Sequence, residues 1–331
     1  MFARFADGWR LGVIAQPHLG GHLPGGYVEH GETTVEAAER EAAQESGRSV
    51  HLVPRPLQAE LPADYPHPQV SSSGSELETW WAMSTPAAPD SRCAREHLHL
   101  DHLHVGFALR PFHVITPPEH PFRWVAPRDL PGLGLARDTQ VMGTYLFSLV
   151  PELARGLQPA GDTEPELRLA LLERMKHDQA VRTAGPDVRA TPEHREKWRA
   201  VDEANTAWVK DLLAARRAFP GDSVIGSDGV QALWLLVQHA DHDRELQARC
   251  ADLLGRTVTA GEADPQHLAL LEDRLACAAG QPQWFGSQFY REPGGPLEPA
   301  PLREPTHVDE FRSWVGLNSL KDYADQLTGL S

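Results

Sequence analysis

Carboxylate side chains with a spacing suited to metal binding occur within residues 23–47, LPGGYVEHGETTVEAAEREAAQESG. Glu41 and Glu45 are four residues apart, so on a helix their carboxylates share one face, with Gln44 beside them. Like charges at this spacing cost about a few tenths of a kcal/mol, and a bound cation reverses that cost. Mg²⁺ accepts a few carboxylates and completes its octahedron with water and phosphate oxygens. The spacing therefore predicts a magnesium site that suits a phosphate-bearing ligand.

The residues around these carboxylates predict a glycine-rich loop that leads into a short helix. Residues 24–26 read Pro-Gly-Gly, and paired glycines permit a tight exposed turn. A threonine just before the apolar positions is a suitable N-cap for a helix over 34–46, and Gly47 suits its C-terminal cap. The chemistry of this stretch therefore depends on one turn and one helix.

Residues 1–158 are predicted to form an α/β domain and residues 163–331 a separate all-α domain, with a linker at about 154–163. Short apolar runs predict strands at 11–15, 79–83, 103–109 and 122–126, and a second helix at 139–153. Pro and Ser clusters predict surface loops at 62–74 and 85–92. In the second half, Thr163 with Glu166 predicts a capping box, and Thr191-Pro192 predicts a further helix start. Later helices are expected at 228–240, 243–260, 265–279 and 318–327.

The loop and helix resemble the motif of the Nudix hydrolases, G-x5-E-x7-R-E-U-x-E-E-x-G-U, in which U is a bulky aliphatic residue. The sequence supplies, in register, Gly26, Glu32, Arg40, Glu41, Glu45 and Gly47. The resemblance covers about residues 1–155, including RWVAPRDLPGL at 123–133. It implies a Nudix-type α/β/α sandwich. It also implies a hydrolase, dependent on Mg²⁺ or Mn²⁺, that cleaves the pyrophosphate of a nucleoside diphosphate linked to another group.

The resemblance also implies a role for each matching residue. Glu41 and Glu45 would bind the metal, Arg40 would orient the carboxylates of the helix, and Glu32 would brace the loop. The catalytic set is thus Glu41, Glu45, Arg40 and Glu32. Residues expected at the substrate are Gly25, Gly26, Gln44 and His99. This family usually supplies one more metal-binding carboxylate from outside the motif, for which Glu119 is the first choice and Glu96 and Asp101 are rivals.

Three residues depart from the motif. Gln44 replaces a glutamate, Ala42 is small for its aliphatic position, and Arg48 replaces the terminal aliphatic residue. A neutral amide oxygen at position 44 would weaken or remove one metal site. These departures favour a second hypothesis, in which the Nudix fold binds a ligand or regulates without efficient turnover.

The tract EHLHLDHLHV, which begins at Glu96, allows two interpretations. In a strand, His97, His99 and Asp101 share one face. Imidazoles on one face suit a transition-metal ion. The alternative, which we favour, is an edge strand whose polar side chains line the diphosphate pocket.

The second half resembles an uncharacterised bacterial helical domain, and that resemblance implies no activity. Polar residues interrupt its apolar stripes and need partners if they are buried. They are Asp178, Asn205, Gln238, His239 and Gln288. Two interpretations stay open, a satisfied hydrogen-bonded core network and a second small-molecule site, which would make the protein bifunctional.

Composition limits the partners. The 331 residues carry a formal charge of −15, which argues against binding to nucleic-acid polymers or anionic membranes. The three cysteines have no zinc or disulfide spacing, and neither a signal peptide nor a membrane span is recognised. We therefore expect a cytoplasmic protein with a small nucleotide or other diphosphate as its partner, and a homodimer stays open.

Overall fold

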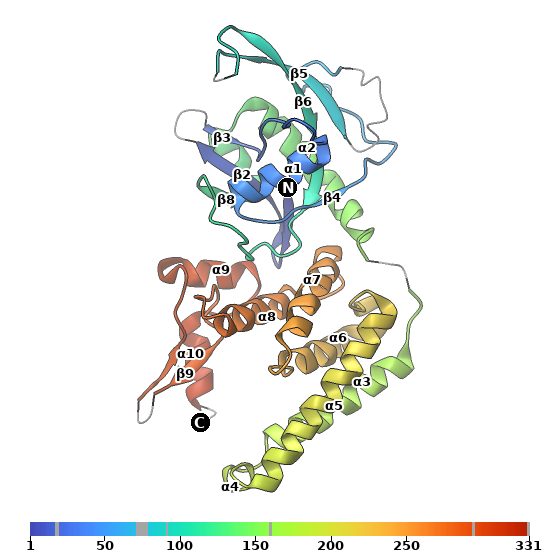
Figure 1. The fold of residues 1–331 in the computed structure, drawn as a ribbon, viewed down its shortest axis with the longest axis vertical. Helices are drawn as coiled ribbons and strands as arrows, with labels where there is room; N and C mark the ends of the chain where they lie inside the picture. Colours follow the sequence, from blue (N-terminus) through green and yellow to red (C-terminus); the bar gives the residue numbers. More distant parts are fainter. Residues whose placement is uncertain (17–19, 71–78, 91, 159–160, 293–294, 330–331) are drawn as a thin grey trace. The chain divides into compact units, whose positions relative to one another are not determined.

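The computed structural model describes residues 1–16, 20–70, 79–90, 92–158, 161–292 and 295–329. The chain divides into two compact units (Figure 1). The first comprises Met1–Arg4 and Gly8–Ala154, and the second comprises Phe5–Asp7 and Arg155–Ser331. None of the helices in the described ranges is long and apolar enough to cross a membrane.

The first unit is built on a mixed sheet. Its strands are β1 (Phe2–Phe5), β2 (Gly8–Gln16), β3 (Gly20–His22), β4 (His51–Val53), β7 (Val105–Phe107) and β8 (Phe122–Val125). The order is β3-β2-β1-β7-β4, and β8 also pairs with β2. The β1–β7 pair is parallel, whereas the β2–β3, β2–β8 and β4–β7 pairs are antiparallel. The strand-and-helix architecture predicted for this half is therefore confirmed.

Two helices and a separate ribbon complete the first unit. The helices are α1 (Thr34–Ser46) and α2 (Arg137–Arg155), with a 3-10 helix η1 (Pro127–Gly132) before α2. The antiparallel ribbon consists of β5 (Trp81–Ala87) and β6 (His97–Leu103). Aromatic side chains fill the core, including Phe2, Trp80, Trp81 and Phe107, each less than 2% exposed.

The second unit is helix-rich. Its helices are α3 (Pro165–Arg182), α4 (Pro186–Arg189), α5 (Pro192–Arg216), α6 (Asp222–Gln238), α7 (Arg244–Ala260), α8 (Pro265–Ala278), α9 (Val308–Trp314) and α10 (Leu320–Gly329). A 3-10 helix η2 (Pro305–His307) and a hairpin of β9 (Phe289–Arg291) and β10 (Leu297–Pro299) join them. Leu171, Leu233, Leu236 and Leu254 are central to one apolar core. The predicted helical second half is confirmed, with a small hairpin that the sequence did not indicate.

Several predicted boundaries need correction. The strand expected at 79–83 begins at Trp81 and continues to Ala87, into a predicted loop, because its residues pair with β6. Pro86 lies near the end of β5, beyond the bridge that joins Met83 to Gln69, and proline is found at such edge positions. The capping box at Thr163 is wrong: α3 begins at Pro165 with Glu164 at the N-cap, and the Glu164 carboxylate pairs with Arg216 at 2.7 Å.

Candidate functional site

Local capping interactions fix both ends of α1. The Thr33 hydroxyl accepts the N–H of Glu36, and the Glu36 carboxylate accepts the N–H of Thr33 at 2.8 Å, which completes a capping box. Gly47 ends the helix at φ 72°, and its N–H donates to the carbonyl of Ala43. A Cβ atom at Gly47 would lie 2.5 Å from the Thr116 carbonyl oxygen. Both this close approach and the positive φ require glycine at this position. The helix is therefore held at the length needed to present Glu41 and Glu45.

Arg40 joins the helix to the loop before it. Its Nε and Nη2 donate to the two Glu32 oxygens at 2.8 and 2.9 Å, and Nη2 also donates to the Tyr27 carbonyl at 2.9 Å. Its Nη1 donates to Glu41 at 2.6 Å and to the Gln44 amide oxygen at 2.9 Å. These charge-assisted bonds, led by those of Arg40, lower the pKa of Glu32 to about 2. Arg40 thus keeps Glu32 ionised and orients the carboxylate of Glu41.

Glu45 lies deeper than its neighbours on the helix. It is 6% exposed, and its Oε2 accepts the N–H of Gly25 at 2.8 Å. Burial raises the pKa of Glu45, the Gly25 bond opposes that shift, and His22, Glu41 and His120 act on it through their charges. His22 and His120 therefore belong to the surroundings of Glu45. Sequence reasoning missed both, because each lies in a different segment from the motif.

The loop passes directly over the Glu41 carboxylate. A Cβ atom on Gly26 would lie 2.3 Å from Glu41 Oε1, whereas a Cβ on Gly25 would meet nothing within 4 Å. The glycine therefore permits a close approach between the backbone and the carboxylate. Glu41 and Glu45 present hard oxygen donors at this approach, which is the donor set that Mg²⁺ prefers. The residues present thus fit a magnesium ion flanked by a glycine-rich loop.

The outlying carboxylates lie apart from this pair. Glu119 is anchored by its backbone, whose N–H donates to the Gln44 carbonyl at 3.0 Å, and its side chain is exposed. Glu96 is exposed just before β6, and Asp101 lies in β6 opposite Met83. Among the described residues, none of these three forms, with Glu41 and Glu45, a group of ligand atoms within 4.8 Å of one another. Of the three, Glu119 is attached to α1 through this backbone bond.

The departure at position 48 has a structural explanation. Arg48 is buried, and its Nε and Nη1 donate to the carbonyls of Pro111 and Ser46, both at 2.6 Å. Its guanidinium lies 4.5 Å from the centre of the Phe122 ring. The arginine therefore fills an apolar position through its stem and an aromatic contact, while carbonyls satisfy its charge. This substitution leaves the carboxylates of α1 unaffected.

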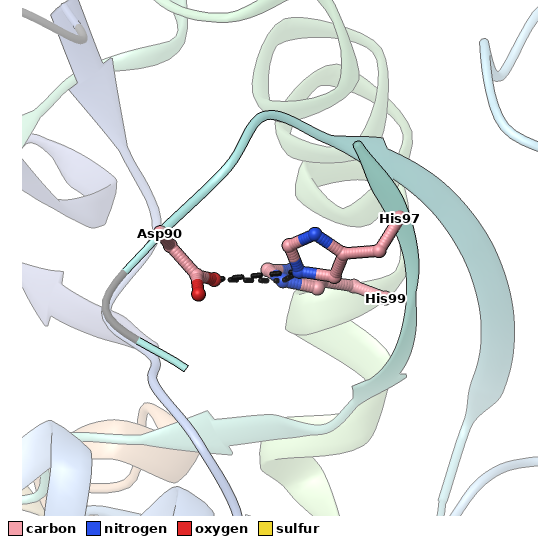
Figure 2. A group of neighbouring side chains, drawn as sticks. All are labelled: Asp90, His97 and His99. Carbon is pink, nitrogen blue, oxygen red and sulfur yellow. Dashed lines mark hydrogen bonds and ion pairs between the residues drawn. The ribbon is translucent and has the colours of Figure 1, made fainter. Parts of the chain in front are cut away.

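The histidine tract forms a different group of side chains (Figure 2). His97 and His99, on β6, point toward Asp90 in the loop that precedes the strand. The Tyr27 hydroxyl donates to Asp90 and lies 3.3 Å from His99 Nε2. That bond and two backbone N–H groups hold the pKa of Asp90 far below its usual range. The predicted strand face is present for the two histidines, and their carboxylate partner is Asp90, which sequence reasoning missed.

Two of the five polar residues singled out in the helical unit come together. His239 Nδ1 lies 2.8 Å from Asp178 Oδ2 and 2.8 Å from Arg182 Nε. Arg182 also donates to Asp202 at 2.8 Å. Burial raises the pKa of Asp202, and the Arg182 charge opposes that shift. A cavity of about 370 Å³ adjoins this cluster and is lined by residues that include His239, Asp202, Asp241, His242, Arg195 and Arg199.

The other three residues have separate partners. Asn205 accepts from Arg174 at 3.1 Å, and Gln238 takes Trp234 and the Leu271 N–H as partners at 3.2 and 3.0 Å. Gln288 belongs to the turn 281–288. Buried Asp273, which the sequence did not single out, holds this turn by accepting the N–H groups of Trp284, Phe285 and Ser287. Desolvation raises the pKa of Asp273 to about 6. Asn205, Gln238 and Gln288 therefore have partners other than His239 and Asp178.

Comparisons with known proteins agree with this division. Residues 9–146 match the family model described as NUDIX domain, and residues 165–329 match one described as Family of unknown function (DUF6624). Neither the curated proteins nor the solved structures contain a match. The chain therefore carries a NUDIX domain followed by a domain of unknown function, which confirms both resemblances. A NUDIX domain indicates, in general terms, a hydrolase of pyrophosphate bonds in nucleotide-type molecules.

Proposed function

We propose that the first unit is a Mg²⁺-dependent hydrolase, able to use Mn²⁺, which cleaves the pyrophosphate of a nucleoside diphosphate linked to another group. The observation that supports this most directly is the approach of the Gly25–Gly26 loop to Glu41 and Glu45, within the NUDIX match. Glycine at both positions would allow the loop backbone to approach the phosphate oxygens closely. The arrangement joins an acidic helix face to a turn suited to phosphate oxygens.

In the proposed reaction, Glu41 and Glu45 hold the metal and Arg40 keeps the Glu41 carboxylate in place. A bound Mg²⁺ ion would neutralise the diphosphate and lower the pKa of a water molecule. A glutamate near the metal would accept the proton from the attacking water. Glu32 accepts hydrogen bonds from Arg40 and from the Glu29 N–H, the latter at 3.0 Å. It thereby positions the loop. Gly25, Gly26, Gln44 and His99 are proposed substrate contacts.

Turnover of dinucleotides, nucleotide sugars and nucleoside triphosphates with Mg²⁺ or Mn²⁺ tests the proposal. We expect Glu45→Gln to lower kcat/KM by about 10²- to 10⁴-fold, because the variant loses a charged metal ligand and with it the activation of the attacking water. Glu39→Gln is the matched control, because Glu39 is exposed on the same helix. If no compound is turned over and a ligand binds tightly without metal, the alternative of a binding or regulatory Nudix fold replaces the hydrolase.

We also propose that the helical unit holds a second small-molecule site at the 370 Å³ cavity beside His239. The observation that favours it is a charged lining, in which His239 and Asp202 border the cavity and Arg182 contacts both of them. Thermal-shift measurements on the full chain, with nucleotides and sugar phosphates, test this. A shift that persists in Glu45→Gln and vanishes in His239→Gln supports the site. A shift that only Glu45→Gln removes assigns the ligand to the first unit, and no shift at all counts against the second site.

A further inference from the structure

The geometry points to a transition-metal site in the first unit. We propose that Asp90, His97 and His99 bind one divalent ion of the zinc class in tetrahedral geometry, with a fourth position open to water or another ligand (Figure 2). The site is distinct from the carboxylates of α1 in both residues and donor atoms. It revises the preference for simple pocket lining at this histidine tract, and it replaces Asp101 by Asp90 as the acidic partner. With an ion bound, His99 is a metal ligand and no longer a direct substrate contact.

The separations of the three donor atoms match one face of a tetrahedron. His97 Nε2 and His99 Nε2 are 2.9 Å apart, and they lie 3.3 and 3.6 Å from Asp90 Oδ2. A tetrahedral zinc ion has bonds of about 2.0–2.1 Å to nitrogen and oxygen, which puts neighbouring ligand atoms about 3.3 Å apart. An ion centred on this triangle therefore requires shifts of only a few tenths of an ångström.

The proton on His97 is placed away from the site. His97 Nδ1 lies 2.9 Å from the Arg95 carbonyl oxygen, which can only accept, so Nδ1 carries the hydrogen. The Nε2 of neutral His97 then presents a lone pair toward a carboxylate oxygen and a second imidazole nitrogen. Metal-binding histidines commonly donate their other N–H to a carbonyl in this way, which fixes the tautomer. A cation between the three atoms satisfies the lone pairs that otherwise face one another.

Asp90 is also held in position before any ion binds. Its Oδ1 accepts the N–H groups of Arg92 and Cys93, both at 2.7 Å, so Oδ2 is the atom directed at the histidines. The Tyr27 hydroxyl donates to Oδ2, and the Tyr27 carbonyl accepts from Arg40. An ion at Asp90 would therefore stabilise Tyr27, which belongs to the glycine-rich loop of the first site.

The donor set separates this ion from magnesium. Imidazole nitrogen suits zinc and its transition-metal neighbours, whereas Mg²⁺ takes oxygen ligands. The side chains of Asp90, His97 and His99 are 26, 20 and 33% exposed, so an ion has a route from solvent and room for a fourth ligand. Three protein ligands with one open position is the composition of zinc sites that bind water or substrate.

Metal binding to the full chain tests the proposal. Zn²⁺ affinity is measured by competition with a chromophoric chelator, and Co²⁺ is added separately to record its visible absorption. We expect one tightly bound Zn²⁺ per chain, the intense absorption of four-coordinate Co²⁺, and no displacement by excess Mg²⁺. The double variant His97→Ala/His99→Ala should lose more than about 10²-fold in affinity, and Tyr27→Phe about 10- to 100-fold, because it removes a bond to a ligand.

His102→Ala is the matched control, since His102 lies on the same strand but outside the group, and it should bind like the wild type. Far-ultraviolet circular dichroism of the metal-free proteins checks that each variant folds. Glu45→Gln should also retain the Zn²⁺ stoichiometry, which separates this result from any result on hydrolysis. Equal Zn²⁺ affinity in the wild type and the double variant, or the weak spectrum of six-coordinate Co²⁺, would overturn the proposal.

Discussion

The loop and helix of residues 23–47 and the polar cluster around Asp178 assemble charges in different ways. In the loop and helix, Arg40 and Glu32 are eight residues apart, and their side chains are 26 and 15% exposed. In the cluster, the side chain of Asp178 is 1% exposed, and its partners come from α3 and from the end of α6. The first group comes from residues that are close in the sequence, whereas the second comes from separate helices and surrounds one fully buried carboxylate, Asp178.

This difference predicts that substitutions in the two groups affect different properties, activity in the first and stability in the second. Water can solvate a charge that loses its partner in the loop and helix, so such a loss costs mainly the geometry of the site. A charge left without its partner in a dry interior costs several kcal/mol. We therefore expect variants of the first site to fold but to lose activity, and variants of the second site to lose stability first.

The largest expected effect is on Asp178. Asp178→Ala removes the buried carboxylate beside His239 and Arg182, while Arg182 keeps Asp202 as a partner. Leaving a buried polar group without its partner costs about 1–3 kcal/mol. Urea unfolding followed by far-ultraviolet circular dichroism measures this cost. Asp211→Ala, at an exposed position of α5, should change the free energy of unfolding by less than about 0.5 kcal/mol. Equal costs for the two variants would remove the contrast between the sites.

The two glycines of the loop provide the next test. In Gly26→Ala the new methyl group displaces the Glu41 carboxylate, which should lower kcat/KM by about 10- to 100-fold through misplacement of a reacting group. Gly25→Ala meets open space and should leave kcat/KM nearly unchanged. Thermal midpoints of both variants should stay near the wild-type value. A large loss of stability in Gly26→Ala would show that the loop is structural.

Restoring a carboxylate at position 44 sharpens the account of the first site. Gln44 is exposed and lies within reach of Arg40, so Gln44→Glu adds a charge without burying it. A unit charge about 4 Å from another contributes about 1 kcal/mol even in water, so Mg²⁺ should bind about 5- to 10-fold more tightly. Titration calorimetry measures this change. Weaker Mg²⁺ binding would mean that Gln44 is already better placed than a glutamate.

The smallest expected effect is the pH dependence of Glu32. Its pKa is lowered from 4.5 to about 2 in the folded protein, so its ionised form stabilises the fold above pH 4.5. That contribution is lost as the pH falls through 4.5 toward 2. The difference in thermal midpoint between wild type and Glu32→Gln should therefore shrink over this range. A constant difference for Glu32→Gln over this range would contradict the shift.

Sequence reasoning worked best where neighbours along the chain decide the structure. The helix predicted at 34–46 has those bounds, because Thr33 and Gly47 form its caps with residues within four positions. Thr191 likewise caps α5 as predicted, through the His194 N–H. Sequence reasoning failed where a distant segment competes with local capping: Thr163 and Glu166 were expected to form a capping box, yet α3 begins at Pro165 with Glu164 at its N-cap, and Glu164 accepts from Arg216 on α5.

The sequence by itself therefore determined the NUDIX loop and helix, the order of the two domains and the helical character of the second. These features depend on backbone propensity, capping and side-chain spacing over fewer than about ten residues. Only the tertiary structure decided that His22 and His120 surround Glu45, that Asp90 joins His97 and His99, and that His239 meets Asp178. Each of these contacts depends on chain reversals and on burial, which bring distant side chains together and remove the water between them.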